Sequence, residues 1–207
     1  MTDPDKPTVY LTAFMDYICP FCFIGDLRLE RLRREFTLRI HWRLLEIHPD
    51  TPEGGRPVDE LGYAPEQWRG MMTSLEEMAT TEGITLARRE RTANSHYALL
   101  LAEAAKDDGA GTFYPLHRRL FEAYFVEGRD LGDPETLTEL ARDAGVPRAT
   151  RDRAWGDGGY ELRLQQNLAA ARKAGITGTP TFLIGERRLE GAQPTEKLRA
   201  AAQEAAQ

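Results

Sequence analysis

Two cysteines, three positions apart, constrain this chain more than any other feature. They are the only cysteines among its 207 residues and stand as Cys19-Pro20-Phe21-Cys22. A disulfide between them would close too small a loop to stabilise a fold much. The amino terminus shows no secretory leader, so we expect a cytoplasmic protein whose thiols are kept reduced. The pair is therefore interpreted as metal-binding, catalytic or incidental, and not as a structural disulfide.

The sequence around the cysteines predicts a strand, a helix and a second strand. Residues Val9–Phe14 read as the first strand, Cys22–Glu35 as the helix, and Leu38–Leu45, with alternating apolar and polar residues, as the second strand. Apolar or small residues recur along one side of the helix, at Cys22, Gly25, Leu29, Leu32 and Phe36. The chain therefore opens with a βαβ unit, and the cysteines lie where its first strand meets its helix.

The middle of the chain reads as helical, and strands return only near its end. Helical stripes recur from the Pro49–Pro57 loop to Gly175, and one of them (Trp68, Met71, Met72, Leu75 and Met78) is expected to be core. Strands are predicted at Thr181–Ile184 and Arg188–Glu190, with a last helix from Pro194. We expect an α/β fold in which residues 1–48 and 176–207 form a central mixed sheet flanked by helices. Residues 49–175 are expected to form a large, all-helical insertion.

Charge and hydropathy exclude several classes of partner. The net charge is -6 and the pI is about 5.4, so the chain has no basic footprint to bind nucleic acid or an anionic membrane. No apolar run approaches the ~18 residues that a membrane span needs. We expect neither nucleic acid nor membrane as a partner, and the sequence leaves the oligomeric state open.

The predicted helix gives the two cysteines different roles. Cys22 belongs to its inward-facing stripe, whereas Cys19 precedes the helix and is expected at its amino terminus, facing solvent. Unpaired backbone N–H groups and the helix dipole favour a thiolate there. Cys19 would then attack a disulfide, and Cys22, one turn later, would resolve the mixed disulfide. Pro20 suits the first helical turn because it needs no backbone N–H.

Zinc binding is the main alternative for a CxxC pair, and it requires two more ligands. The chain has no other cysteine, and its four histidines form no spaced pair such as HxxxH. We therefore expect no metal and no tightly bound cofactor.

A second motif precedes the predicted strand at Thr181. It reads Gly178-Thr179-Pro180-Thr181-Phe182. Proline at the start of a strand is explained either by a cis bond in a tight turn or by a trans proline that begins an edge strand. The CxxC pair favours the cis alternative.

Together these motifs resemble the DsbA-like branch of the thioredoxin superfamily. Three further segments, residues 121–130, 132–134 and 191–194, resemble its FrnE-like subgroup. The resemblance implies a thioredoxin fold in which Cys19 is the nucleophile, Cys22 the resolving thiol and Pro180 a cis-proline beside them. The residues expected to contact substrate are Pro20, Phe21, Thr179 and His96.

Two positions depart from the thioredoxin pattern. Ala13 stands where a buried carboxylate often assists proton transfer, and Ile18 replaces the usual tryptophan before the first cysteine. Asp16 is a nearer carboxylate, but the sequence does not show where its side chain points. The identity of a proton shuttle and the redox poise of the dithiol therefore stay open.

The predicted function is thiol–disulfide exchange with protein or small-molecule disulfides and thiols, with glutathione or another thiol as a possible co-substrate. One alternative is a glutathione-dependent isomerase or transferase of the same fold, related to 2-hydroxychromene-2-carboxylate isomerase. Those relatives typically carry serine in place of the first cysteine and lack the second thiol. Another alternative is a thioredoxin-fold binding module, such as a holdase, with a vestigial dithiol.

Overall fold

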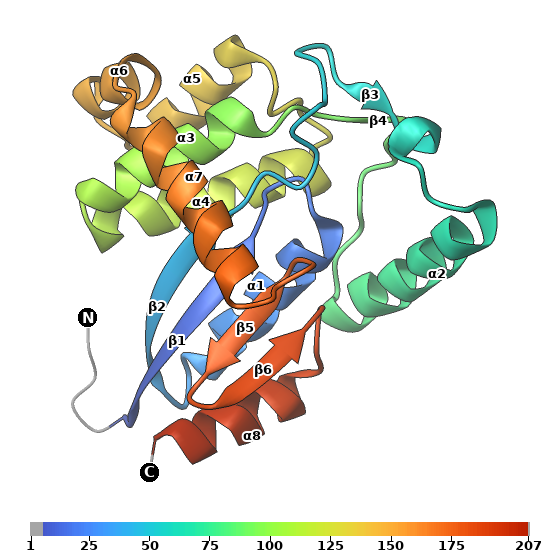
Figure 1. Cartoon of the computed structure of the whole chain (residues 1–207), viewed down its shortest axis with the longest axis vertical. Coiled ribbons are helices and arrows are strands. Elements are labelled where there is room, and N and C mark those ends of the chain that lie inside the picture. The colour runs from blue at the N-terminus through green and yellow to red at the C-terminus, as the bar shows by residue number, and fades with distance from the viewer. Residues whose placement is uncertain (1–5, 207) are drawn as a thin grey trace. The chain divides into compact units, whose positions relative to one another are not determined.

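A computed structural model describes residues 6–206 (Figure 1). Its residue contacts divide the chain into two compact units. One unit combines residues before 46 with residues from Asn167 onward, and the other is Glu46–Gln166. We call them the thioredoxin-like unit and the inserted unit.

The thioredoxin-like unit is built on a four-stranded mixed sheet. Its strands are β1 (Thr8–Met15), β2 (Thr37–Leu44), β5 (Thr181–Ile184) and β6 (Arg187–Glu190), in the order β2-β1-β5-β6. Strand β1 pairs parallel with β2, whereas β5 is antiparallel to both of its neighbours. The four strands predicted from the sequence thus lie in one sheet, with bounds that differ by one residue at several ends.

Helices cover the two faces of this sheet unequally. On one face lie α1 (Pro20–Leu32) and α8 (Thr195–Ala205), which pack against each other and bury apolar residues of the strands. Register places Val9, Leu11, Ala13 and Met15 of β1 on that face. On the other face, Ala171 and Ile176 pack against Phe14 and Leu183. Among the described residues of the thioredoxin-like unit, the end of α7 (Gly159–Lys173) and the turn after it thus cover the Phe14 end of this second face.

Local sequence explains where α1 begins and ends. Cys19 has an extended backbone and forms the N-cap, and Pro20 follows at the first helical position, where a missing N–H is not needed. The helix begins at Pro20, two residues earlier than the apolar stripe predicted. It ends at Leu32, before the predicted Glu35, and its buried side includes Cys22, Gly25 and Leu29.

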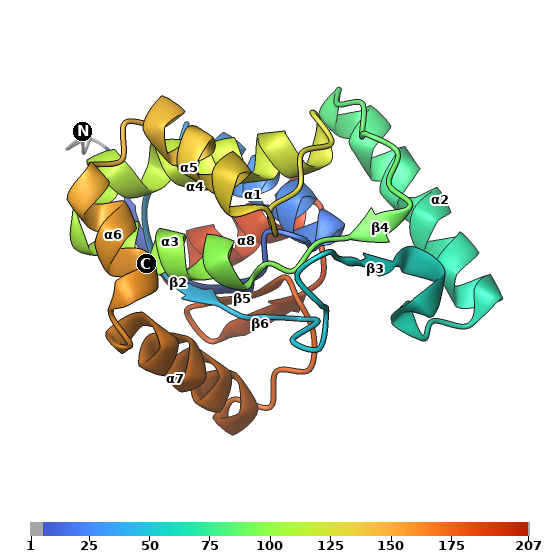
Figure 2. The same cartoon turned by 90° about the horizontal axis from the view of Figure 1, so that it is seen from above.

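The inserted unit is mostly helical. Helix α3 packs against α4, α5 and α6, which Figures 1 and 2 show as a cluster. Its helices are α2 (Pro65–Glu82), α3 (His96–Asp107), α4 (Ala110–Phe125), α5 (Pro134–Asp143), α6 (Arg148–Gly156), the first part of α7 and the short 3-10 helix η1 (Val58–Leu61). Asp133 caps α5 by accepting hydrogen bonds from the N–H groups of Glu135 and Thr136.

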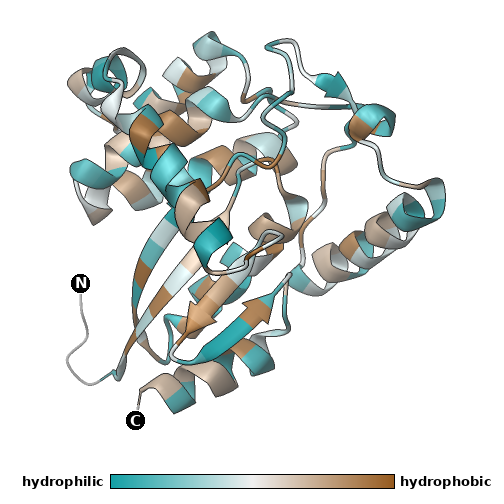
Figure 3. Ribbon diagram, viewed as in Figure 1, coloured by the Kyte–Doolittle hydropathy of each residue, from teal (hydrophilic) through white to brown (hydrophobic). Residues whose placement is uncertain are grey.

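Two predictions for the inserted unit need correction. The unit is not entirely helical, because β3 (Arg56–Pro57) and β4 (Arg91–Thr92) form a two-stranded antiparallel sheet of their own. This sheet does not join the four-stranded one. The methionine stripe of α2 was also expected to be core, but only Leu75 and Ala79 are buried there and the methionines are half-buried. Figure 3 shows both hydrophobic and hydrophilic residues along α2. Helical spacing identifies the apolar side of a helix, but not how deeply tertiary packing buries it.

The two units divide at 45/46 and 166/167, whereas the sequence placed the divisions at 48/49 and 175/176. Side-chain contacts at Asn167 explain the second difference. Its amide nitrogen donates to the carbonyl oxygen of Leu44 at 3.2 Å, and its amide oxygen accepts from Arg43 at 3.1 Å. These bonds hold the last part of α7 to the end of β2. No helix within residues 6–206 is both long and apolar enough to cross a membrane.

Candidate active site

Both cysteines lie at the junction of β1 and α1, as the sequence predicted. Strand β1 ends at Met15, and a short turn brings the chain to Cys19 at the cap of α1. The sulfur of Cys19 accepts a hydrogen bond from the backbone N–H of Cys22 at 3.3 Å. Both residues are free thiols. The helix terminus therefore places a polarised N–H group directly on the first sulfur.

This geometry separates the acidities of the two thiols. Burial acts to raise the pKa of Cys19, but hydrogen bonds from the side chains of Cys22 and Thr179 and from the backbone N–H of Cys22 outweigh it, so the pKa is lowered. Burial raises the pKa of Cys22 well above its usual value, and the hydrogen bond and charge of Cys19 raise it further. Cys19 is thus the thiol that ionises first, and a thiolate is the reactive form of cysteine.

One expectation about Cys19 was wrong. The sequence placed it facing solvent, but only 4% of its surface is exposed, and Cys22 is fully buried. The next two residues, Pro20 and Phe21, are half-buried. A position at the start of a helix predicts an accessible sulfur only if no other segment covers it. Here Thr179 approaches the sulfur from a distant part of the chain.

The Thr179–Pro180 peptide bond is cis, as the sequence analysis favoured. The carbonyl oxygen of Thr179 lies 3.5 Å from the sulfur of Cys19 and accepts its S–H hydrogen bond when the thiol is protonated. Two hydrogen bonds hold this turn in place. The hydroxyl of Thr181 donates to the carbonyl oxygen of Gly178 at 2.7 Å, and the N–H of Gly191 donates to that of Pro180 at 2.8 Å.

Gly25 allows the proline turn to approach α1 closely. A Cβ atom at this position would lie 2.9 Å from Cζ of Phe182 and 3.3 Å from Cγ of Pro180. Phe182 is fully buried, so its ring has little room to move away. Sequence analysis assigned Gly25 only to the helical stripe and missed this role, because the contact joins residues more than 150 positions apart.

Asp16 is a buried carboxylate beside the cysteines. Its side-chain oxygen accepts from the N–H of Ile18 at 3.3 Å, and its carbonyl oxygen accepts from the N–H of Cys19 at 3.2 Å. Its negative charge acts to raise the pKa of Cys19. The direction of this side chain was open from the sequence, and the structure places it in the turn that leads to the nucleophile.

His96 belongs to the inserted unit and is engaged by two glutamates of that unit. Its Nδ1 lies 3.3 Å from Glu46 and its Nε2 lies 2.7 Å from Glu161. The hydrogen bond to Glu46 contributes most to a rise of its pKa to about 9, which burial partly opposes and Glu161 reinforces. Asn94 and Ser95 precede His96, the first residue of α3. The side chain of Asn94 accepts from the N–H of His96, whereas that of Ser95 makes no cap hydrogen bond.

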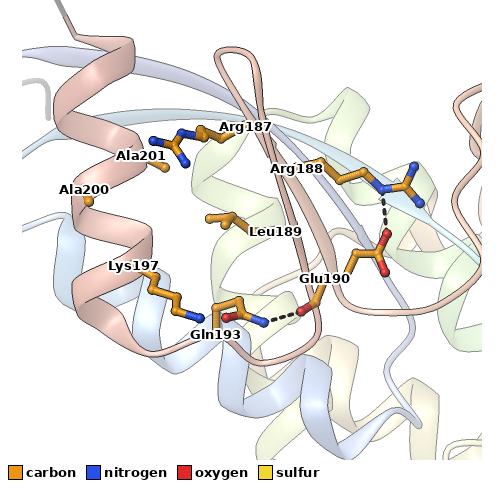
Figure 4. Close-up of a pocket in the computed structure, with 8 residues that line it drawn as sticks. All are labelled: Arg187, Arg188, Leu189, Glu190, Gln193, Lys197, Ala200 and Ala201. Carbon is orange, nitrogen blue, oxygen red and sulfur yellow. Dashed lines mark hydrogen bonds and ion pairs between the residues drawn. The ribbon is translucent and has the colours of Figure 1, made fainter.

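No metal-binding cluster is found among residues 6–206, and a hollow lies elsewhere in the thioredoxin-like unit. Within the described part of the chain, no group of three or more His, Cys, Asp or Glu side chains is placed to hold a metal ion. A hollow of about 560 Å³ lies between β6 and α8 (Figure 4). The carboxylate of Glu190, which lines this hollow, forms an ion pair with Arg188. The side-chain amide of Gln193 donates a hydrogen bond to the backbone carbonyl oxygen of Glu190. The hollow is lined by Arg187, Arg188, Leu189, Glu190, Gln193, Lys197, Ala200 and Ala201.

Comparison with known proteins identifies the family. The model of the DSBA-like thioredoxin domain matches residues 10–203, nearly the whole chain. The chain belongs to the DSBA-like thioredoxin domain family. The Bacillus subtilis protein YwbO is 30% identical over 189 residues, which cover 89% of this chain and 91% of that protein. The DsbA thiol:disulfide interchange protein of Bordetella parapertussis is 33% identical over 72 residues, covering 35% of this chain and 34% of that protein.

Solved structures agree with this membership. A probable DsbA oxidoreductase from Streptomyces coelicolor, SCO1869, superposes with a TM-score of 0.82 at 26% identity, covering 95% of this chain and 89% of that one. A 2-hydroxychromene-2-carboxylate isomerase superposes with a TM-score of 0.75 at 16% identity, covering 94% and 95%. The second likeness shows the fold alone. Membership of the DSBA-like family implies thiol–disulfide chemistry in general.

Proposed function

We propose that this protein is a dithiol–disulfide oxidoreductase that works through a mixed disulfide on Cys19. The observation that carries the proposal is the 3.3 Å hydrogen bond from the N–H of Cys22 to the sulfur of Cys19. It accompanies opposite shifts in acidity, with the pKa of Cys19 lowered and that of Cys22 raised. Cys19 is thereby prepared to attack as a thiolate, while Cys22 stays protonated until it resolves the mixed disulfide.

The first step is attack of the Cys19 thiolate on one sulfur of a substrate disulfide. A new S–S bond joins Cys19 to that sulfur, the substrate S–S bond breaks, and the leaving thiolate takes up a proton. Cys22 then loses its proton and attacks the sulfur of Cys19, which releases the second substrate thiol. The substrate disulfide has gained two electrons, and the Cys19–Cys22 dithiol has become a disulfide. The reverse sequence oxidises a substrate dithiol.

Thr179 and Pro180 are proposed to receive the substrate beside Cys19. The carbonyl oxygen of Thr179 is 3.5 Å from the nucleophile, so a substrate strand that pairs with this backbone would bring its disulfide to the sulfur. Proline contributes no N–H group at this position. Pro20 and Phe21, which are half-buried in the first turn of α1, are proposed as apolar substrate contacts. The role of His96 as a substrate contact also stays a proposal.

We further propose that the protein is a FrnE-like member of the family that acts in the cytoplasm. Its substrates would be protein or small-molecule disulfides, with glutathione or another thiol completing the cycle. The support is the resemblance of residues 121–130, 132–134 and 191–194. A direct test is the reduction potential of the Cys19–Cys22 pair, measured in glutathione buffers. A potential far above that of glutathione would contradict a reducing role and favour oxidation.

Turnover of a protein disulfide is the decisive test of the function. Insulin reduction by dithiothreitol should be accelerated by the protein in catalytic amounts. The same preparation should be assayed for glutathione-dependent isomerisation of 2-hydroxychromene-2-carboxylate, because the isomerase shares the fold. Acceleration in the first assay alone supports the proposal. Activity in the second alone, or delayed aggregation without insulin reduction, would contradict it.

A further inference from the structure

Within residues 6–206, no helix of the thioredoxin-like unit covers the first part of one face of the four-stranded sheet. Register places Thr8, Tyr10, Thr12 and Phe14 of β1 on this face. Phe14 is buried against Ala171 and Ile176, but the coverage ends there. In Figure 1, no helix of the thioredoxin-like unit lies in front of the first halves of β1 and β2. Because mixed sheets in α/β domains are usually covered on both faces, this uncovered area needs an explanation.

Tyr10 is the most exposed large apolar side chain described in the protein. It lies on β1, an interior strand of the sheet, yet 74% of its surface is accessible. Its partner in the register of β2 is Arg39, and Thr12 is opposite His41. Both β2 side chains are exposed. We call Thr8, Tyr10, Thr12, Arg39 and His41 the open sheet face.

Arg39 gives the open sheet face a positive charge. The five residues of the open sheet face include no carboxylate. The row through His41 and Thr12 continues across the sheet to Leu183 and Arg188, and the next row, through Phe14 and Thr181, ends at Glu190 on the same face. Arg188 is neutralised by Glu190 at 2.7 Å, whereas Arg39 forms no ion pair with any residue between 6 and 206. The described residues of the thioredoxin-like unit hold 13 Lys and Arg against 8 Asp and Glu, a net of +5. The overall charge of -6 therefore conceals a basic sheet-bearing unit.

We propose that the open sheet face docks a partner protein that presents carboxylates around an apolar side chain. Tyrosine and arginine are the residue types that most often dominate binding energy at protein interfaces. Tyr10 offers a rigid ring to the apolar group, and Arg39 offers a guanidinium that a carboxylate would pair with in two hydrogen bonds. His41 and the threonines supply a polar rim.

This surface is distinct from the dithiol. Tyr10 lies five residues before Met15, the last residue of β1, which corresponds to about 17 Å along an extended strand. The chain reaches Cys19 only after that end. Docking at the open sheet face therefore does not depend on the proposed redox reaction, and the two proposals can fail separately.

Three cysteine-free peptides of equal length test the proposal on the full-length, ¹⁵N-labelled protein. The first is rich in Glu around a central Leu-Phe pair, the second has Lys for every Glu, and the third has Ser for Leu and Phe. The first peptide should shift the amide resonances of Tyr10, Thr12, Arg39 and His41. Its affinity should exceed that of the other two by about tenfold and should fall as salt is added.

Matched variants identify the side chains responsible. Tyr10→Thr, which keeps a good strand residue, should weaken binding about tenfold, and Arg39→Ser about threefold. Leu162→Gln removes another exposed apolar side chain, and Arg34→Ser another exposed arginine without an ion-pair partner in the described chain; both should bind normally. Insulin reduction should be unchanged in Tyr10→Thr.

Three outcomes would overturn the proposal. Equal binding of the Lys peptide would show that charge does not select the partner. Resonance shifts away from β1 and β2 would place the interaction elsewhere. Concentration-dependent shifts of Tyr10 and Arg39 in the absence of peptide, with an increase in molecular mass, would show that a second copy of the chain occupies this face.

Discussion

The sulfur of Cys19 lies 3.5 Å from the carbonyl oxygen of Thr179, although 160 positions separate the two residues in the sequence. This contact unites the two motifs of the chain at one site. Cys19 comes from the start of α1 and Thr179 from the turn before β5, and pairing of β1 with β5 brings these elements together. A reactive thiol therefore lies beside a backbone segment that can receive an extended substrate.

Serine substitutions should separate the roles of the two cysteines. Cys19→Ser removes the nucleophile and should abolish insulin reduction. Cys22→Ser leaves Cys19 able to attack a disulfide but removes the thiol that resolves the product, so mixed disulfides on Cys19 should accumulate. The insulin assay measures the loss of turnover, and mass spectrometry of the protein after incubation with oxidised glutathione detects the mixed disulfides. If Cys19→Ser trapped adducts and Cys22→Ser turned over normally, the assignment would be reversed.

Replacing Asp16 should make Cys19 more acidic. The buried carboxylate acts to raise the pKa of Cys19, so Asp16→Asn, which removes the charge and keeps the shape, should lower that pKa. The pH dependence of thiolate absorbance near 240 nm or of iodoacetamide alkylation reports the change. Asp157→Asn, at an exposed aspartate of the inserted unit, is the control. An unchanged or raised pKa in Asp16→Asn would contradict the electrostatic role.

His96 should stabilise the inserted unit in a defined pH range. Its pKa in the folded protein is raised to about 9, mainly by the hydrogen bond to Glu46, from about 6.5 when unfolded. A raised pKa contributes stability that is complete below the unfolded value and disappears as pH rises through the folded value. His96→Gln should lower the free energy of unfolding at pH 6 on the order of 1 kcal/mol, after allowance for screening at this half-exposed site.

Urea denaturation at pH 6 and pH 10 measures this effect, and the deficit of His96→Gln should shrink at the higher pH. His48→Gln is the matched control. The pKa of His48 is lowered by burial and by Arg56, so its ring gains no such stabilisation as a cation. A deficit of His96→Gln that stayed equal at pH 10 would mean that packing, and not the charged imidazole, stabilises the unit.

Two glycine substitutions should change stability in opposite directions. Gly25→Ala would place a Cβ atom 2.9 Å from the buried ring of Phe182, and overpacking costs ~1–3 kcal/mol. This cost exceeds the ~1 kcal/mol that alanine gains over glycine in a helix. Gly70→Ala, in α2, meets no atom within 4 Å and should stabilise by up to ~1 kcal/mol.

Thermal unfolding and insulin reduction together test the role of Gly25. Gly25→Ala should lower the melting temperature and slow turnover, because a shift of Phe182 also moves the adjoining Pro180. Gly70→Ala should raise the melting temperature and leave turnover intact. Normal stability and turnover in Gly25→Ala would show that the close approach between α1 and the proline turn is not needed.

Spacing and residue type were enough to predict much of the fold. Alternation in Leu38–Leu45 and the stripe through Cys22 and Leu29 depend on short-range periodicity, so they predicted β2 and α1 correctly apart from their ends. The small strands β3 and β4 were missed, because two-residue strands have no periodicity to detect. The prediction that the methionines of α2 are core was also wrong, because the burial of a side chain depends on which other segments of the chain pack against it.

The sequence by itself determined the dithiol, its place between a strand and a helix, and the proline turn expected beside it. These follow from local chemistry, because a helix terminus polarises the thiol that caps it and proline restricts its own backbone. Only the tertiary structure decided that Cys19 is buried, that the Asp16 carboxylate is buried in the turn before it, and that Tyr10 is exposed on an interior strand. Those properties depend on tertiary contacts between segments far apart in the sequence, and no local sequence pattern specifies such contacts.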